Sequence, residues 1–147
     1  MLLDPAGIRA AVDGLFAFAR DRDVDLVVAA EARGFVLGGA LATRLDAGFV
    51  PARKPGKLPA ATSSVEYALE YGLDALEVHS DALAGGARVL VHDDLLATGG
   101  TARALCDLVE GAGAEVVGCA FVVELSFLGG RRQLASHDVA ALVDYEG

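Results

Sequence analysis

The sequence has 147 residues, of which 54% are hydrophobic and 22% charged, and its formal net charge at pH 7 is −9. This length and composition predict a single domain over residues 1–147 with a packed core, and they exclude a largely disordered chain. The excess of acidic over basic residues argues against non-specific binding to nucleic acid or to an anionic membrane, because both need a basic surface.

No segment looks like a membrane span or an export signal. The longest apolar run, Val116–Val123, is far shorter than the roughly 18 residues that cross a bilayer. The amino terminus lacks a basic start and an apolar stretch, so we expect a cytoplasmic protein. Cys106 and Cys119 stand alone in apolar surroundings, which predicts buried free thiols and no zinc site.

The amino-terminal part of the chain alternates between helical and strand patterns. Asp4 and Pro5 suit the start of a helix, and apolar residues recur at helical spacing from there to about Arg20. The next expected elements are a buried strand at 25–30, a loop at 31–33, a helix rich in small residues at 34–45 and a strand at 48–53.

The middle of the chain predicts a loop followed by a ribbon. Residues 54–64 are polar and contain two prolines and a glycine, which favours a loop. Apolar and polar residues then roughly alternate in 65–71 and 75–79, a pattern typical of a β-ribbon with one solvated face. We expect residues 54–79 to form a mobile β-flap.

The carboxyl-terminal part returns to strands and helices, and together the elements predict an α/β fold. Strands separated by helices at this spacing indicate a central parallel sheet flanked by helices on both faces. Ligands of such sheets bind beyond the carboxyl ends of the strands, so the loops at 31–34 and 93–101 are the expected functional loops. The remaining expected elements are strands at 88–92, 115–124 and 139–145, a loop at 93–100, and helices at 101–110 and 130–135.

The most informative segment is Val89–Thr101, with the sequence VLVHDDLLATGGT. A buried strand leads into two carboxylates and then into a glycine-bearing loop that opens a helix. Such a loop offers free backbone N–H groups at the positive end of a helix dipole, where a phosphate fits. Asp93 and Asp94 are expected where the strand ends, in reach of sugar hydroxyls. The segment is not a Walker loop, because it has no lysine after the glycines.

Residues Asp93–Thr101 resemble the signature that binds phosphoribosyl pyrophosphate (PRPP) in type I phosphoribosyltransferases. Their exact residue sequence resembles that of the adenine phosphoribosyltransferases in particular. The resemblance extends over nearly the whole chain. It implies the type I phosphoribosyltransferase fold and a transferase of purine salvage that converts PRPP and adenine into AMP and pyrophosphate, with Mg²⁺ as cofactor. Further matching segments are Glu31–Phe35, Phe49–Pro59, Tyr67–Glu77 and Val123–Leu125.

The resemblance also implies roles for individual residues. Lys57 and Glu70 are the expected catalytic residues: Lys57 closes over the pyrophosphate, and Glu70 handles the proton of the purine ring. Asp93 and Asp94 contact the ribose hydroxyls, and Mg²⁺ is held through PRPP without a dedicated set of protein ligands. The residues expected to bind PRPP or AMP are Arg33, Arg53, Lys54, Lys57, Tyr71, Asp93, Asp94, Ala97, Thr98, Gly99, Gly100 and Thr101.

Two alternatives to an adenine-specific enzyme stay open. Members of the family begin with a further segment that forms part of a hood over the adenine ring, whereas this sequence starts at Met1–Pro5, after that segment. The base could therefore be another purine, such as hypoxanthine or xanthine. The other alternative is a noncatalytic PRPP-binding regulatory domain, although such a protein would have lost flap residues that this sequence keeps, Lys57 and Glu70. The resemblance also implies a homodimer.

Overall fold

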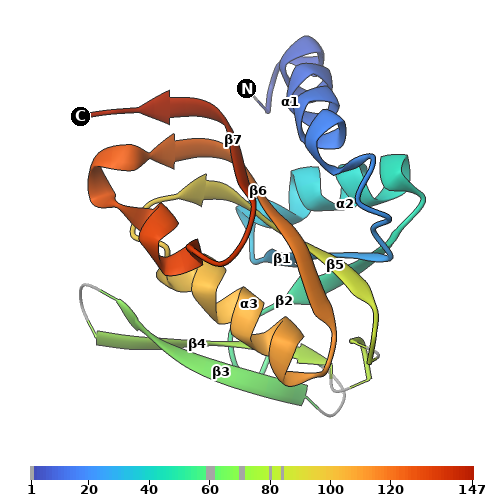
Figure 1. Ribbon diagram of the computed structural model, residues 1–147, viewed down its shortest axis with the longest axis vertical. Helices are drawn as coiled ribbons and strands as arrows, with labels where there is room; N and C mark the ends of the chain where they lie inside the picture. Colours follow the sequence, from blue (N-terminus) through green and yellow to red (C-terminus); the bar gives the residue numbers. More distant parts are fainter. Residues whose placement is uncertain (1, 59–61, 70–71, 80, 84) are drawn as a thin grey trace.

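A computed structural model of the protein describes residues 2–58, 62–69, 72–79, 81–83 and 85–147. These residues form a sheet of five strands, all parallel, in the order β2-β1-β5-β6-β7. Helices cover both faces of this sheet (Figure 1). The strands are β1 (Leu26–Ala30), β2 (Gly48–Ala52), β5 (Arg88–Leu96), β6 (Glu115–Leu125) and β7 (Val139–Tyr145).

Helices α1 (Pro5–Ala19) and α2 (Arg33–Leu45) lie on one face of the sheet, and α3 (Gly100–Gly111) lies on the other. The side chain of Asp4 caps α1 by accepting a hydrogen bond from the Ala6 amide at 3.0 Å, with Pro5 in the first turn. Because both faces are covered, the central strands are buried on both sides, which explains their continuous apolar runs.

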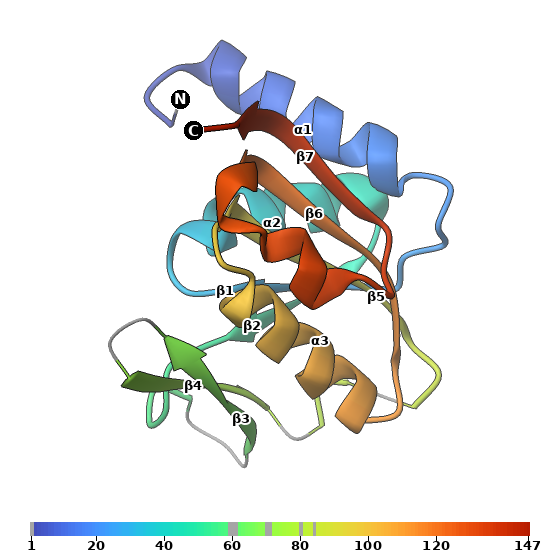
Figure 2. The ribbon, with the colours of Figure 1, turned by 60° about the vertical axis from the view of Figure 1, so that its left-hand side comes forward.

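A separate antiparallel hairpin packs beside α3, at the bottom of Figure 2. It consists of β3 (Thr62–Leu69) and β4 (Gly72–His79). Arg53, just after β2, forms an isolated antiparallel bridge with Glu77 of β4. The hairpin is therefore tied to the edge of the main sheet through the residue that follows β2.

Two apolar cores hold the layers together. One lies between α1, α2 and the sheet and includes Leu15, Leu41 and Leu90. The other lies under α3 and the hairpin and includes Leu76, Leu105 and Phe121. Cys106 and Cys119 are both buried in this second core as free thiols, as the sequence predicts, with their Sγ atoms 3.7 Å apart.

The predicted α/β fold with a central parallel sheet is confirmed, and most element boundaries agree within a few residues. Two expectations need correction. β3 begins at Thr62, inside the expected loop 54–64. β5 continues to Leu96 because it pairs with β6 through Leu96↔Glu124, so the expected loop at 93–100 is shorter and Asp93 and Asp94 lie within the strand. The short helix expected at 130–135 is present as a 3₁₀ helix, η2 (Gly130–Leu134), which follows η1 (Ser126–Leu128).

Candidate functional site

The loops that follow β1, β2 and β5 meet at one edge of the sheet, because parallel strands place their carboxyl ends together. The first loop leads from Glu31 into α2, and the peptide bond between Glu31 and Ala32 is cis. The second carries the basic residues 53–57, and the third runs from β5 into α3. The predicted site residues in these three loops thus lie at the same edge of the sheet, although they come from separate parts of the sequence.

Asp93 and Asp94 lie where β5 loses one of its two neighbours. β1 pairs with β5 only as far as His92, whereas β6 continues beside it to Leu96. The start of α2 fills the space beside them: a Cβ atom added to Gly34 would lie 3.0 Å from Asp93 Oδ1. This glycine allows the α2 backbone to approach the acidic pair closely.

Asp93 has an unusual protonation equilibrium. Burial, together with the neighbouring Asp94 carboxylate, raises the pKa of Asp93 to about 7. The backbone N–H of Asp94 donates to Asp93 Oδ1 at 2.8 Å. Arg33 Nε lies 3.1 Å from Asp94 Oδ2, and its positive charge opposes the rise in the pKa of Asp93. Near neutral pH, Asp93 can therefore either donate or accept a hydrogen bond.

A pocket of about 170 Å³ opens between this acidic pair and the start of α3. No side chain caps the start of α3, so its first N–H groups are available to a ligand. Those groups and the helix dipole favour an anion. Arg33 adds a positive charge at the rim. The described residues that line the pocket are Arg33, Asp93, Asp94, Leu95, Leu96, Ala97, Thr98, Gly99, Gly100, Thr101 and Ala102.

The back of this loop rests on η2. Gly99 has φ +91°, and a Cβ atom there would lie 2.6 Å from the Gly130 carbonyl oxygen. A Cβ atom on Gly130 would in turn lie 2.5 Å from the carbonyl oxygen of Ala97. η2 is itself anchored, because Arg131 Nε donates to both carboxylate oxygens of the buried Glu124 at 2.9 Å. Two glycines, and the ion pair between half-exposed Arg131 and buried Glu124, therefore hold the loop in this shape.

The three basic residues after β2 gather around Glu31, whose side chain is only 9% exposed. Its Oε2 lies 3.0 Å from Lys57 Nζ, and its Oε1 accepts a hydrogen bond from the backbone N–H of Lys54 and lies 3.8 Å from Arg53 Nε. The hydrogen bond from Lys54 and the positive charges of Lys57 and Arg53 hold the pKa of Glu31 below its usual value.

The structure thus brings together two groups of the predicted residues. Arg33, the acidic pair and Ala97–Thr101 line one pocket, whereas Arg53, Lys54 and Lys57 surround Glu31 at the neighbouring loop. Glu70 and Tyr71 lie outside the described residues. Sequence reasoning placed Glu31 in an expected functional loop without giving it a role; its position between a predicted strand end and Arg33 was the available signal.

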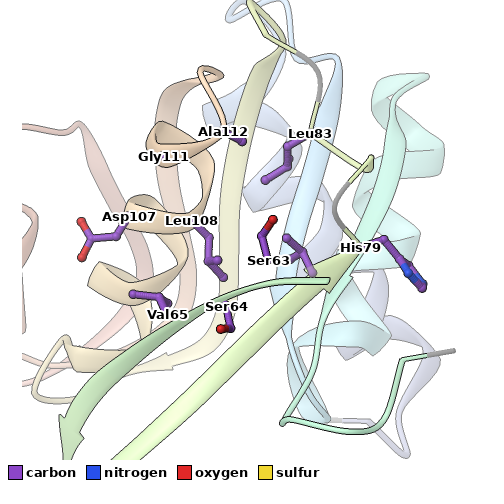
Figure 3. Close-up of a pocket in the computed structure, with 10 residues that line it drawn as sticks. Ser63, Ser64, Val65, His79, Leu83, Asp107, Leu108, Gly111 and Ala112 are labelled. Carbon is purple, nitrogen blue, oxygen red and sulfur yellow. The ribbon is translucent and has the colours of Figure 1, made fainter. Parts of the chain in front are cut away.

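A second cavity, of about 220 Å³, lies between the hairpin and α3, away from this edge (Figure 3). Its described lining residues include Val65, Leu83 and Leu108 and contain no lysine or arginine. Asp107 is paired with Arg103 at 3.0 Å, and the ring of His79 points away from Leu108 (Figure 3). Although larger, this cavity therefore does not suit an anionic ligand.

The chain matches the model of the phosphoribosyl transferase domain over residues 1–140. It is 58% identical over 146 residues to the adenine phosphoribosyltransferase of Rubrobacter xylanophilus, a match that covers 99% of this chain and 79% of the relative. The chain belongs to the adenine phosphoribosyltransferase family.

Solved structures of this family have the same fold. The adenine phosphoribosyltransferase of Thermoanaerobacter pseudethanolicus superposes with a TM-score of 0.95 at 49% identity, covering 98% of this chain and 84% of that one. Another similar structure is the Saccharomyces cerevisiae adenine phosphoribosyltransferase, complexed with an imino-altritol bisphosphate and adenine. It superposes with a TM-score of 0.90 at 37% identity, and the match covers 96% of this chain and 82% of the yeast chain. The type I phosphoribosyltransferase fold that the sequence resemblance implies is confirmed.

The described residues contain no cluster of three or more histidine, cysteine, aspartate or glutamate side chains placed to hold a metal ion. No helix within the described ranges is long and apolar enough to cross a membrane.

Proposed function

We propose that this protein transfers the 5-phosphoribosyl group of PRPP to adenine, which yields AMP and pyrophosphate. The observation that carries the proposal is the pocket in which Asp93, Asp94 and Arg33 meet the uncapped start of α3. This arrangement offers an anion site beside two carboxylates, as a 5-phosphorylated sugar requires. Membership of the adenine phosphoribosyltransferase family supports the choice of base.

In this proposal the loop Ala97–Thr101 binds the 5′-phosphate. Its backbone N–H groups and the hydroxyl groups of Thr98 and Thr101 are the donors, and Gly99 and Gly100 let the phosphate approach the backbone. Asp93 and Asp94 then face the 2- and 3-hydroxyl groups of the ribose. Because the strand β5 holds both carboxylates, the sugar is oriented by a rigid element.

The basic residues bind the pyrophosphate. The bond from C1 of the ribose to the pyrophosphate oxygen breaks with its electron pair going to that oxygen, and the sugar acquires oxocarbenium character. Arg33 and the loop cations Arg53, Lys54 and Lys57 stabilise the charge that develops on the departing group. Lys57 also closes over the substrate, which excludes water that would otherwise attack the sugar cation.

Glu70 and Tyr71 belong to the proposal through the family resemblance alone, since they lie outside the described residues. The ring nitrogen of adenine that attacks C1 gives the base a positive charge. The carboxylate of Glu70 offsets that charge by accepting a proton from the purine. Tyr71 packs the closed flap over the base.

Mg²⁺ is the proposed cofactor, and the residues present fit a metal that arrives with its substrate. Mg²⁺ retains waters and commonly binds through substrate phosphates with one or two carboxylates. Asp93 and Asp94 stand at the pocket where such waters would lie, and no larger set of ligands occurs among the described residues. Bound Mg²⁺ would supply charge neutralisation on the pyrophosphate. We also propose that the protein works in the cytoplasm as a homodimer, as the resemblance implies.

Turnover with a panel of bases tests the proposal. The purified chain is incubated with PRPP, Mg²⁺ and labelled adenine, hypoxanthine or xanthine, and nucleotide formation is followed over time. We expect AMP from adenine and far slower reaction of the other two purines. Faster reaction of hypoxanthine or xanthine would reassign the base. Binding of PRPP without turnover of any base would reassign the protein to the regulatory class.

A further inference from the structure

Glu31 occupies an unusual place for a carboxylate that has no assigned role. It directly follows β1, its side chain is 9% exposed, and it faces the three residues proposed to bind pyrophosphate. Its contact with Lys57 Nζ, at 3.0 Å, is an ion pair whose lysine side chain is still 48% exposed. A buried negative charge therefore holds an accessible positive one at the edge of the site.

A second carboxylate holds the backbone of the same loop. Glu77 of β4 accepts hydrogen bonds from the Gly56 amide at 2.7 Å and from the Thr62 hydroxyl at 2.7 Å. Its own backbone exchanges hydrogen bonds with Arg53 at 2.8 and 2.7 Å. These bonds hold the loop backbone to β4 independently of the ion pair at Lys57. The ammonium group of Lys57 can therefore change its partner without breaking them.

We propose that Glu31 is a positioning residue that acts as an internal counter-ion: it holds Lys57 before substrate binds, and the pyrophosphate group of PRPP then takes its place. The inference rests on the proposed function and deepens it. Pyrophosphate carries more negative charge than one carboxylate, so it displaces Glu31 from the ammonium group. When the product leaves, Glu31 recovers Lys57 and thereby lowers the cost of losing the pyrophosphate.

Removing the negative charge of Glu31 should strengthen the binding of pyrophosphate, not weaken it. Glu31→Gln keeps an oxygen that can accept from the Lys54 amide, but it no longer competes with pyrophosphate for Lys57. We expect Mg²⁺–pyrophosphate, measured by calorimetry, to bind about threefold or more tightly. In steady-state assays KM for PRPP and kcat should both fall, because release of pyrophosphate slows. A merely structural role would leave KM unchanged or raise it.

Three further variants complete the test. Lys57→Met in the Glu31→Gln background should remove the gain in pyrophosphate affinity, since the lysine is the group for which both anions compete. Glu31→Asp, which shortens the carboxylate, should tighten pyrophosphate binding less than Glu31→Gln does. Glu115→Gln is the matched control, because Glu115 pairs with Arg88 at 3.2 Å at the start of β6, far from the site. It should change neither quantity.

Several outcomes would overturn the inference. Unchanged or weaker pyrophosphate binding by a folded Glu31→Gln chain would show that Glu31 does not compete with the ligand. A gain that persists after Lys57→Met would show that it does not act through Lys57. If Glu31→Gln does not fold, tighter binding by Glu31→Asp supports the inference, and unchanged binding overturns it. A wild-type chain that neither binds pyrophosphate nor forms AMP would overturn the proposed function itself.

Discussion

Arg33 Nε lies 3.1 Å from Asp94 Oδ2, so the first residue of α2 is joined to the acidic pair on β5. The arginine side chain is 73% exposed, whereas that of Asp94 is 25% exposed. An ion pair this open to water contributes little to stability. Its position at the rim of the pocket gives it another use, because the same guanidinium group can turn from Asp94 to an incoming anion.

Replacing Arg33 should therefore separate function from folding. We expect Arg33→Gln to lower kcat/KM for PRPP about 10- to 100-fold, the loss of a charge-assisted contact to a polyanion. The free energy of unfolding should change by no more than about 0.5 kcal/mol, because the side chain is exposed. Steady-state kinetics and urea unfolding measure the two quantities. A large loss of stability with unchanged kcat/KM would contradict the role given to Arg33.

The raised pKa of Asp93 predicts a pH dependence of stability. In the folded chain Asp93 keeps its proton up to about pH 7, whereas in the unfolded chain an aspartate loses it near pH 4. Between these values the folded state binds more protons, so Asp93 makes the free energy of unfolding fall as pH rises. Asp93→Asn should remove this contribution. As the pH rises from 4 to 7, the free energy of unfolding of this variant should increase by at least about 1 kcal/mol relative to that of the wild type.

The neighbouring His92 should act in the opposite direction. It is fully buried, its Nδ1 bonds the Ala120 carbonyl oxygen at 2.9 Å, and burial lowers its pKa to about 4. The unfolded state takes up a proton near pH 6.5, so stability from His92 is lost as pH falls from about 6.5 to 4. In wild type the two slopes partly cancel. The free energy of unfolding of Asp93→Asn, measured from pH 4 to 7, should rise with pH. A free energy that falls over this range would contradict the role given to His92.

Gly99 and Gly39 offer a matched pair of glycine substitutions. Gly99→Ala requires φ +91° and places a methyl group 2.6 Å from the Gly130 carbonyl oxygen, so it should cost at least about 2 kcal/mol of stability and distort the phosphate loop. At Gly39, inside α2, an added Cβ meets nothing within 4 Å. Gly39→Ala should stabilise by about 0.5–1 kcal/mol. Thermal unfolding compares them, and equal effects would contradict the close contact with η2.

The parts of the site that are local in sequence could be predicted from it. The order of carboxylates, glycines and threonines in Asp93–Thr101 predicts a strand end, a loop and a helix start, and the structure shows these three elements in that order. The end of β5 could not be predicted, because the strand continues to Leu96 through pairing with β6, a partner more than twenty residues away. Pairing of that kind leaves no local signal.

Long-range contacts also explain which site residues were missed. Glu31 gains its importance from Lys54 and Lys57, which follow the neighbouring strand. The pair of Glu124 and Arg131 anchors η2, on which the loop Ala97–Thr101 rests. In the sequence each of these residues is an ordinary charged side chain. Their roles follow from the parallel sheet, which brings separate loops to one edge.

A crystal structure of the protein with AMP and Mg²⁺–pyrophosphate would test the central claim most directly. The account predicts the 5′-phosphate of AMP in the pocket at the start of α3, within hydrogen-bonding distance of the backbone N–H groups of Ala97–Thr101. The ribose hydroxyls should lie against Asp93 and Asp94. Pyrophosphate should lie beside Arg33, with Lys57 turned from Glu31 towards it. A 5′-phosphate bound elsewhere, with this pocket free of ligand, would contradict the assignment of the site.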